Sequence, residues 1–131
     1  QAIFKELKKL PSVTGIAVQE QITGFELIIG AKRDSQFGPI ILVGVGGIFT
    51  EVLQDFSVRI CPLNENDAKQ MLEETKVYQT LKNVNVKQII NVILKINDIM
   101  LKHHEIIELD INPLIVNEKD AIVVDARMIL E

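Results

Sequence analysis

Residues 106–129, IIELDINPLIVNEKDAIVVDARMI, are the stretch from which the fold of this chain is most directly predicted. Its two arms, 106–116 and 121–129, are rich in the β-branched and aliphatic residues that favour strands. The four polar residues between them, 117–120, have the composition of a turn. The stretch is therefore predicted to form an antiparallel β-hairpin.

The position of the turn sets which residues of the hairpin face each other. If the turn is centred between residues 118 and 119, facing residues have numbers that sum to 237. Asn112 then faces Asp125, and Asp110 faces Arg127. Because residues two apart in a strand share a face, these four polar side chains gather on one side, flanked by Leu114 and Val123. The other side is expected to face the core and carries Leu109, Ile111, Ile115, Ile122, Val124 and Met128.

The polar side of the hairpin has the composition of a metal site. Two carboxylates and an amide oxygen are hard ligands that suit Mg²⁺, which also takes water and phosphate oxygens. Asp110, Asn112 and Asp125 are the candidate ligands. A surface ion pair between Asp110 and Arg127, with polar neighbours, explains the same pattern. Both interpretations require this register, since a slip of one residue would separate the side chains.

The composition of the chain excludes several classes of protein. Its 131 residues are 47% hydrophobic but only 5% aromatic, which indicates one folded domain with an aliphatic core rather than a disordered chain. The longest apolar run, residues 39–49, is too short and too interrupted by Gly and Pro to span a membrane. A net charge of −4 offers no basic surface for nucleic acid.

The single cysteine and the N-terminal sequence indicate in which cellular compartment the protein is expected. Cys61 cannot form an internal disulfide and is expected to be a small buried residue. No segment resembles a signal peptide, so the expected localisation is cytoplasmic. The chain begins at Gln1 in the middle of a pattern, without an initiator Met, and is therefore expected to be a piece of a longer protein.

The remaining helices and strands are predicted from hydrophobic periodicity and from helix-capping residues. Helices are predicted over 2–9, 67–75 and 86–103, with a helical turn over 50–53. Extended segments are predicted over 16–19, 25–31, 40–45 and 57–61. Asn64 and Asp67 are placed to form a capping box at the start of the second helix. The fold class is therefore α+β: a mostly antiparallel β-sheet with packed helices, ending in a hairpin proposed to bind metal.

A glycine-rich loop follows the apolar strand over 40–45. In residues 44–47, GVGG, backbone N–H groups can approach a phosphate, but on this motif alone a plain tight turn is the favoured interpretation. The loop is not a dinucleotide fingerprint, because Phe49 stands at the third glycine position, and no Gly-Lys-Ser/Thr follows to make a P-loop.

Three charged residues stand near the strands. Glu26 lies in an otherwise apolar strand and is expected to point outward. Arg33 and Arg59 can hold phosphates, or they can pair with Asp34 and Asp55.

Several sequence blocks occur in an ordered series. They are residues 24–30 (GFELIIG), 33–39 (RDSQFGP), 44–48 (GVGGI), 55–63 (DFSVRICPL), 108–114 (ELDINPL) and 124–127 (VDAR). This series resembles the ATP-grasp domain of ADP-forming acyl-CoA synthetases, and most nearly the acetyl-CoA synthetase β-subunit type; succinyl-CoA synthetase β subunits are more distant. The resemblance covers nearly all of residues 14–131 and implies that residues 1–131 are the C-terminal portion of an ATP-grasp domain.

The resemblance implies a nucleotide site. The backbone around Gln19, Glu20 and Ile22 would meet the adenine, and the Glu26 carboxylate would hold the ribose hydroxyls.

The resemblance also implies a metal and phosphate site. Asn112 and Asp125 would bind Mg²⁺ beneath the nucleotide phosphates, with Asp110 as a further ligand or as a neighbour that supports them. Gly46 and Gly47 would form a loop near the transferred phosphoryl group. In this family, acyl-CoA, ADP and phosphate give a carboxylic acid, CoA and ATP through a phosphohistidine.

The same resemblance implies missing parts. The family's lysine-bearing strand, glycine-rich phosphate loop and histidine, and its CoA-binding and phosphohistidine-bearing parts, have no counterpart in this sequence. The fragment alone is therefore expected to be inactive and to self-associate or expose an apolar patch larger than about a few hundred Å². Two alternatives remain: an ATP-grasp-like regulatory module of a protein acetyltransferase, or a structural and interaction domain that binds no nucleotide.

Overall fold

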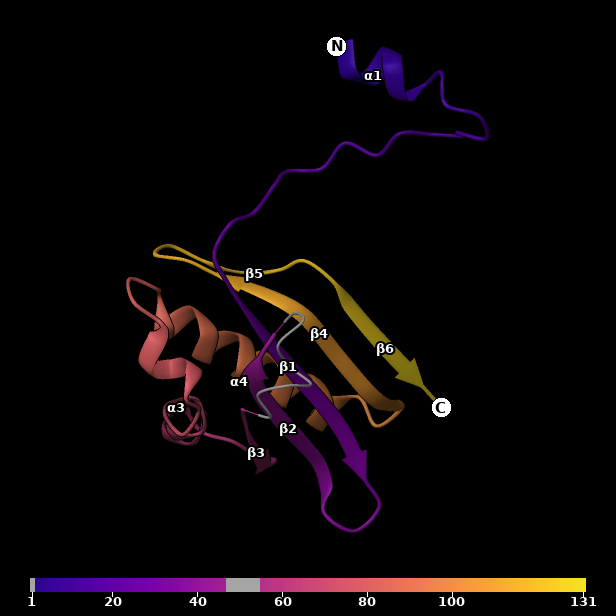
Figure 1. Ribbon diagram of the computed structural model, residues 1–131. Coiled ribbons are helices and arrows are strands. Elements are labelled where there is room, and N and C mark those ends of the chain that lie inside the picture. The colour runs from indigo at the N-terminus through magenta and orange to yellow at the C-terminus, as the bar shows by residue number, and fades with distance from the viewer. Residues whose placement is uncertain (1, 47–54) are drawn as a thin grey trace.

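The strands of this chain form one antiparallel sheet with helices on one face, in a computed structural model that describes residues 2–46 and 55–131 (Figure 1). The strand order is β3-β2-β1-β4-β5, and β6 also pairs with β4. The strands are β1 (Phe25–Asp34), β2 (Gly38–Val45), β3 (Phe56–Ile60), β4 (Ile106–Val116), β5 (Ala121–Val123) and β6 (Ala126–Leu130). The helices are α1 (Ala2–Leu7), α3 (Glu65–Glu73), the 3₁₀ helix η2 (Val77–Thr80) and α4 (Val86–Lys102). The α+β prediction is confirmed; the predicted turn at 50–53 lies outside the described residues.

One face of the sheet is sealed by α3 and α4. Alternate residues of β1 and β2 point to this face and are almost fully buried, as are the inward residues of both helices. The cluster includes Leu27, Ile29, Ala31, Ile41, Val43, Ala68, Met71, Leu72, Ile89, Ile93, Ile96 and Met100. The core is therefore aliphatic, as the composition predicts.

The helix boundaries follow local signals. The capping box at α3 is confirmed: the Asn64 side chain accepts from the Asp67 N–H, and the Asp67 carboxylate accepts from the Asn64 N–H, both at 3.0 Å. None of the described helices is long and apolar enough to cross a membrane.

The register of the terminal hairpin is the predicted one. Leu114 pairs with Val123 and Asp110 with Arg127, so the facing numbers sum to 237 on both sides of the break that divides the second arm into β5 and β6. The prediction of one uninterrupted second arm was wrong, since residues 124 and 125 belong to neither strand.

The predicted core face of the hairpin was wrong in part. Against β1, Leu27 pairs with Leu114 and Ile29 with Ile111, so β4 carries an extra residue at Asn112–Pro113. The side of β4 that faces the core therefore switches at this bulge. As a result, Leu114 is fully buried, whereas it was predicted to flank the polar face. Val124 and Met128 were expected in the core but are 52% and 50% exposed, because α3 and α4 pack mainly against β1, β2, β3 and β5.

The N-terminal segment lies away from the sheet. The predicted helix is present as α1, but none of its residues is buried, and a long connection separates it from β1 (Figure 1). The extended segment predicted over 16–19 forms no strand.

Candidate functional site

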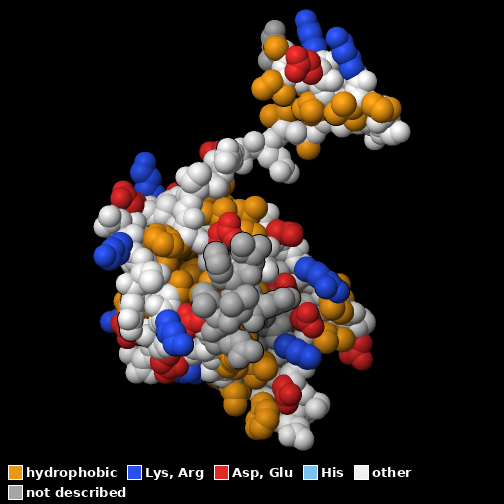
Figure 2. Space-filling model, in the orientation of Figure 1, with side chains coloured by type: hydrophobic (Ala, Val, Ile, Leu, Met, Phe, Trp, Pro, Cys, Tyr) orange, Lys and Arg blue, Asp and Glu red, His pale blue; other side chains and the backbone are white. Residues whose placement is uncertain are grey.

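The face of the sheet opposite α3 and α4 carries the candidate site. On β1, Glu26, Ile28, Gly30 and Lys32 alternate with the buried residues and so share this open face. In Figure 2 this face is turned toward the viewer, and hydrophobic side chains gather at its lower end. The open face therefore combines charged and apolar groups on one surface.

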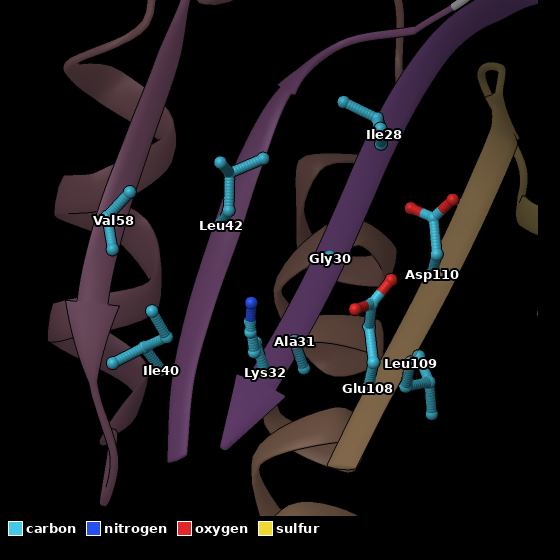
Figure 3. Close-up of a pocket in the computed structure, with 10 residues that line it drawn as sticks. All are labelled: Ile28, Gly30, Ala31, Lys32, Ile40, Leu42, Val58, Glu108, Leu109 and Asp110. Carbon is cyan, nitrogen blue, oxygen red and sulfur yellow. The ribbon is translucent and has the colours of Figure 1, made fainter. Parts of the chain in front are cut away.

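A pocket of about 360 Å³ lies on the open face across β1 and its neighbours. It is lined by Ile28, Gly30, Ala31, Lys32, Ile40, Leu42, Val58, Glu108, Leu109 and Asp110. Figure 3 shows an apolar wall from β2 and β3 on one side and the two carboxylates of β4 on the other, with Lys32 between them. The pocket thus offers an apolar surface next to an acidic edge.

Gly30 leaves the space in the middle of this pocket. It pairs with Asp110 across β1 and β4, and a methyl group at Gly30 would meet only the Asp110 Oδ1, at 4.0 Å. A Cβ at this position would therefore meet no backbone atom within 4 Å. The glycine therefore keeps the Asp110 carboxylate accessible from the open face.

Asp110 lies in a negative environment. Burial raises the pKa of its carboxyl, and the charges of Glu108 and Asp125 raise it further, while Arg127 lowers it. Since carboxylates that repel one another are stabilised by a cation, this environment favours a bound positive charge.

The hairpin supplies part of a cation site. The Asn112 N–H donates to the Asp125 carbonyl oxygen at 3.2 Å, so these two residues face each other as predicted. Across residues 2–46 and 55–131, no group of three or more His, Cys, Asp or Glu side chains is arranged to hold a metal. The donors present, two carboxylates and one amide, fit Mg²⁺ only as a partial set that phosphate and water oxygens would complete.

The residues predicted to meet the nucleoside lie at the start of the sheet. Glu26 is exposed on β1 opposite Ile115, in the same row as the pocket. Gln19 and Glu20 are exposed and Ile22 is partly buried in the connection that leads into β1. The structure thus aligns Glu26 with the pocket. Gln19, Glu20 and Ile22 lie in the connection before β1 and do not line the pocket.

The glycines after β2 have a backbone role. The Gly46 N–H donates to the Glu26 carbonyl oxygen at 3.0 Å, and a Cβ at Gly46 would lie 2.8 Å from the Leu27 carbonyl carbon. Because this N–H is engaged, the phosphate-loop prediction rests on Gly47, which lies outside the described residues.

Both arginines have partners other than those expected. Arg33 donates to the carbonyl oxygens of Met100, His103 and Ile106 at 2.6, 3.0 and 3.2 Å, which ties β1 to the end of α4. Of the two alternatives that the sequence left open, a pairing with Asp34 is not observed: that carboxylate accepts from the N–H groups of the turn after β1, which lowers its pKa.

Arg59 is likewise held within the fold. It pairs with Glu74, whose carboxylate also accepts from Ser57, and these bonds lower the pKa of Glu74. The alternative pairing with Asp55 is not observed; Asp55 accepts instead from the Lys76 and Val77 N–H groups at 2.7 Å.

Cys61 is buried as predicted. Burial raises the pKa of its thiol to about 11, so the thiol stays protonated at neutral pH.

The sequence analysis did not assign Gly30, Lys32 or Glu108 to a site. A usable signal was present, because Gly30 and Lys32 alternate with Glu26 along one strand and Glu108 stands two residues before Asp110. The apolar wall of the pocket had no such signal, since Leu42 and Val58 belong to other strands that only the sheet brings together.

Known proteins are similar to this chain in sequence and in fold. The sequence profile of the ATP-grasp domain matches residues 1–130. The beta subunit of ADP-forming acetate–CoA ligase I from Pyrococcus furiosus is 45% identical over 113 residues, which are 82% of this chain and 49% of that subunit. ADP-forming acetate–CoA ligase II from Archaeoglobus fulgidus is 36% identical over 134 residues, which cover 98% of this chain and 20% of that enzyme.

A solved structure has the same architecture. The dinucleotide-forming acetyl-coenzyme A synthetase 1 of Ca. Korarchaeum cryptofilum, in complex with coenzyme A and Mg-AMPPCP and with its phosphohistidine segment pointing towards the nucleotide binding site, matches with a TM-score of 0.82 and 41% identity over 85% of this chain and 55% of that one. The chain thus spans about half the length of these subunits and one fifth of the Archaeoglobus enzyme. From its sequence profile, its six-stranded antiparallel sheet and these relatives, the chain belongs to the ATP-grasp domain family.

Proposed function

We propose that this chain is the C-terminal portion of the ATP-grasp domain of an ADP-forming acyl-CoA synthetase of the acetyl-CoA type, and that it binds the nucleotide and Mg²⁺. The reaction is the reversible conversion of acyl-CoA, ADP and phosphate to a carboxylic acid, CoA and ATP through a phosphohistidine. The CoA-binding and phosphohistidine-bearing parts would come from another domain or subunit of the same enzyme. The names of the relatives support the reaction class, and the complex with Mg-AMPPCP supports the ligands.

The observation that carries the proposal is the shared placement of the hairpin donors and the open face. Asn112 and Asp125 face each other at the bulge of β4, Asp110 lies two residues before Asn112 on the same strand, and the pocket opens beside Asp110. Glu26 stands in the row of β1 residues that borders this pocket. A nucleotide lying along β1 would place its ribose at Glu26 and its phosphates toward the hairpin donors.

The residues have distinct tasks in phosphoryl transfer. A bound Mg²⁺ would supply neutralisation of the phosphate charge. Asn112 and Asp125 would position that cation, and Asp110 would keep the surrounding potential negative. Glu26 would orient the nucleoside through hydrogen bonds, and the apolar wall of the pocket would exclude water from the reacting groups.

The test is Asp125→Ala in the complete enzyme. Turnover of nucleotide with Mg²⁺ is expected to fall to background, measured by acetyl-CoA formation over a titration of MgCl₂. Asp120→Ala, an exposed aspartate in the turn of the same hairpin, is the matched control and should keep the activity of the unmodified enzyme. If Asp125→Ala has unchanged activity and unchanged Mg²⁺ dependence, the hairpin is not a metal site.

A second variant tests the role of the pocket independently of the cation site. Gly30→Leu leaves all three hairpin donors in place and inserts a side chain beside Asp110. We expect the KM for nucleotide to rise at least about tenfold while the apparent affinity for Mg²⁺ changes little. Unchanged KM in Gly30→Leu would place the substrate elsewhere on the sheet.

A further inference from the structure

Strand β6 presents an unpaired backbone edge. The N–H of Asn112 donates to the Asp125 carbonyl oxygen, and the N–H of Glu131 donates to the Glu105 carbonyl oxygen. In an antiparallel ladder only every second residue directs its N–H and C=O at the neighbouring strand. The odd-numbered residues of this arm therefore bond to β4, while Ala126, Met128 and Leu130 direct their backbone groups outward, where no partner lies among the described residues.

The opposite edge of the sheet is protected. At β3, the Arg59 guanidinium donates to the outward carbonyl oxygen of Val58 at 2.9 Å, and α3 packs against the strand. Such covering prevents edge strands from pairing with other chains. On β6, no described side chain bonds to the outward backbone, no proline interrupts the strand, and Met128 and Leu130 are 50% and 57% exposed. Figure 1 shows β6 as the outermost strand on its side of the sheet.

We propose that β6 pairs antiparallel with β6 of a second copy of this chain, so that the two sheets become one continuous sheet across a two-fold axis. The charges select the register. With the axis at Ile129, Arg127 faces Glu131 of the second copy and Met128 faces Leu130, and each of these contacts occurs twice. An isologous interface of this kind is complementary to itself.

The neighbouring registers are worse. An axis at Met128 sets Asp125 opposite Glu131, which brings two acids together. An axis at Arg127 sets that arginine opposite its own copy. Like charges directly opposite each other destabilise a strand pair, so only the register at Ile129 satisfies the charges on both strands.

The backbone agrees with the register that the charges select. Met128 and Leu130 direct their N–H and C=O outward, so each Met128–Leu130 pair can exchange both hydrogen bonds of an antiparallel pair. Ile129 then forms a non-hydrogen-bonded pair with itself on the axis, where side chains approach most closely. The pairing also covers the exposed apolar side chains of Met128 and Leu130.

The first test reverses the charges. In Glu131→Arg the two arginine contacts become repulsive, and we expect the dimer Kd measured by sedimentation at low salt to rise about tenfold or more. The double variant Arg127→Glu/Glu131→Arg restores opposite charges and should recover the dimer. Glu131 is exposed at the end of the strand, so its substitution does not threaten folding. A Kd unchanged in Glu131→Arg, or not recovered in the double variant, would overturn this register.

The second test detects the contact directly and does not depend on affinity. Ile129→Cys sets two thiols on the axis, and mild oxidation should link the two copies by a disulfide, seen as a doubled mass on a non-reducing gel. Glu118→Cys, exposed in the hairpin turn, is the matched control and should stay monomeric. The native Cys61 is buried and does not interfere. Equal cross-linking of the two variants, or none in either, would refute the pairing.

Discussion

The two faces of the sheet are built from the same strands but differ in what covers them. On the helix-covered face, aliphatic side chains from β1, β2, α3 and α4 are almost fully buried. The buried polar groups on this side have partners; the Asn97 side chain, for example, accepts from the Leu63 N–H at 2.8 Å. On the open face, apolar side chains such as Phe56 and Ile60 of β3 are 56% and 51% exposed, and β4 contributes the carboxylates of Glu108 and Asp110.

From this difference we infer that the helix-covered face contributes most of the folding stability and that the open face is suited to binding. Burial of aliphatic surface is the largest favourable contribution to folding, so substitutions on the covered face should change the free energy of unfolding. The open face carries a pocket with the carboxylates of Glu108 and Asp110 in its lining, which contribute little to folding but suit a ligand. Apolar side chains such as Phe56 are exposed on this face, while a large apolar patch and self-association remain proposals.

The largest expected effect contrasts two neighbours on β1. Leu27→Ala removes a fully buried side chain and should lower the free energy of unfolding by about 2–5 kcal/mol. Ile28→Ala, one residue later and on the open face, should lower it by less than about 1.5 kcal/mol because its side chain is only partly buried. Urea unfolding followed by circular dichroism measures both. Equal losses would remove the distinction between the faces.

A pair of glycines gives the next effect. A Cβ at Gly44 would lie 2.5 Å from the Asp55 carbonyl oxygen, so Gly44→Ala must shift the backbone and should cost about 1–3 kcal/mol. Gly30→Ala meets only a carboxylate oxygen at 4.0 Å and should change stability by less than about 0.5 kcal/mol. Thermal unfolding of the two variants side by side makes the comparison. A large loss of stability in Gly30→Ala would show that the pocket has no room for a Cβ beside Asp110.

The contacts of Arg33 predict a smaller loss. Arg33→Met keeps much of the aliphatic stem but removes three hydrogen bonds to carbonyl oxygens at the end of α4 and the start of β4, with an expected cost of about 1–2 kcal/mol. Lys32→Met, its exposed neighbour on the open face, is the control and should be nearly neutral. Amide hydrogen exchange should show faster opening at the end of α4 only in Arg33→Met. Unchanged exchange there would mean that the arginine does not hold this junction.

The smallest effect tests the charge on the open face. Because the pKa of Asp110 is raised in the folded protein, the folded state binds its proton more tightly than the unfolded state. Stability should therefore fall as the pH rises from the ordinary carboxyl pKa through the raised one, and the penalty persists above it. Asp110→Asn removes this penalty, so without added metal the variant should be slightly more stable than the original at pH 7 and equal to it near pH 3.

The measurement is the melting temperature across this pH range. Asp120→Asn, in the exposed hairpin turn, should show no such difference. A destabilised Asp110→Asn at pH 7 would mean that the carboxylate has a favourable partner, as the ion-pair interpretation with Arg127 requires.

Much of the fold and the site was predictable from local patterns. A polar turn between two aliphatic runs was sufficient to predict the register of the hairpin, because turn position and the two-residue period of strands leave a single alignment. That alignment brought Asn112 and Asp125 together. The capping box at α3 was equally local, since its residues are three positions apart.

Only the tertiary structure decided which groups met across distant parts of the chain. The bulge at Asn112–Pro113, which reverses the inward side of β4, arises from pairing with β1, some eighty residues earlier in the sequence. Arg33 bonds to α4 rather than to the adjacent Asp34, because folding brings three carbonyl oxygens to the guanidinium while Asp34 serves its own turn. The pocket beside Gly30 likewise exists only where β1, β2, β3 and β4 lie side by side. Sequence patterns predict which residues lie side by side within one hairpin or helix. Packing between elements determines which residues from distant segments come into contact.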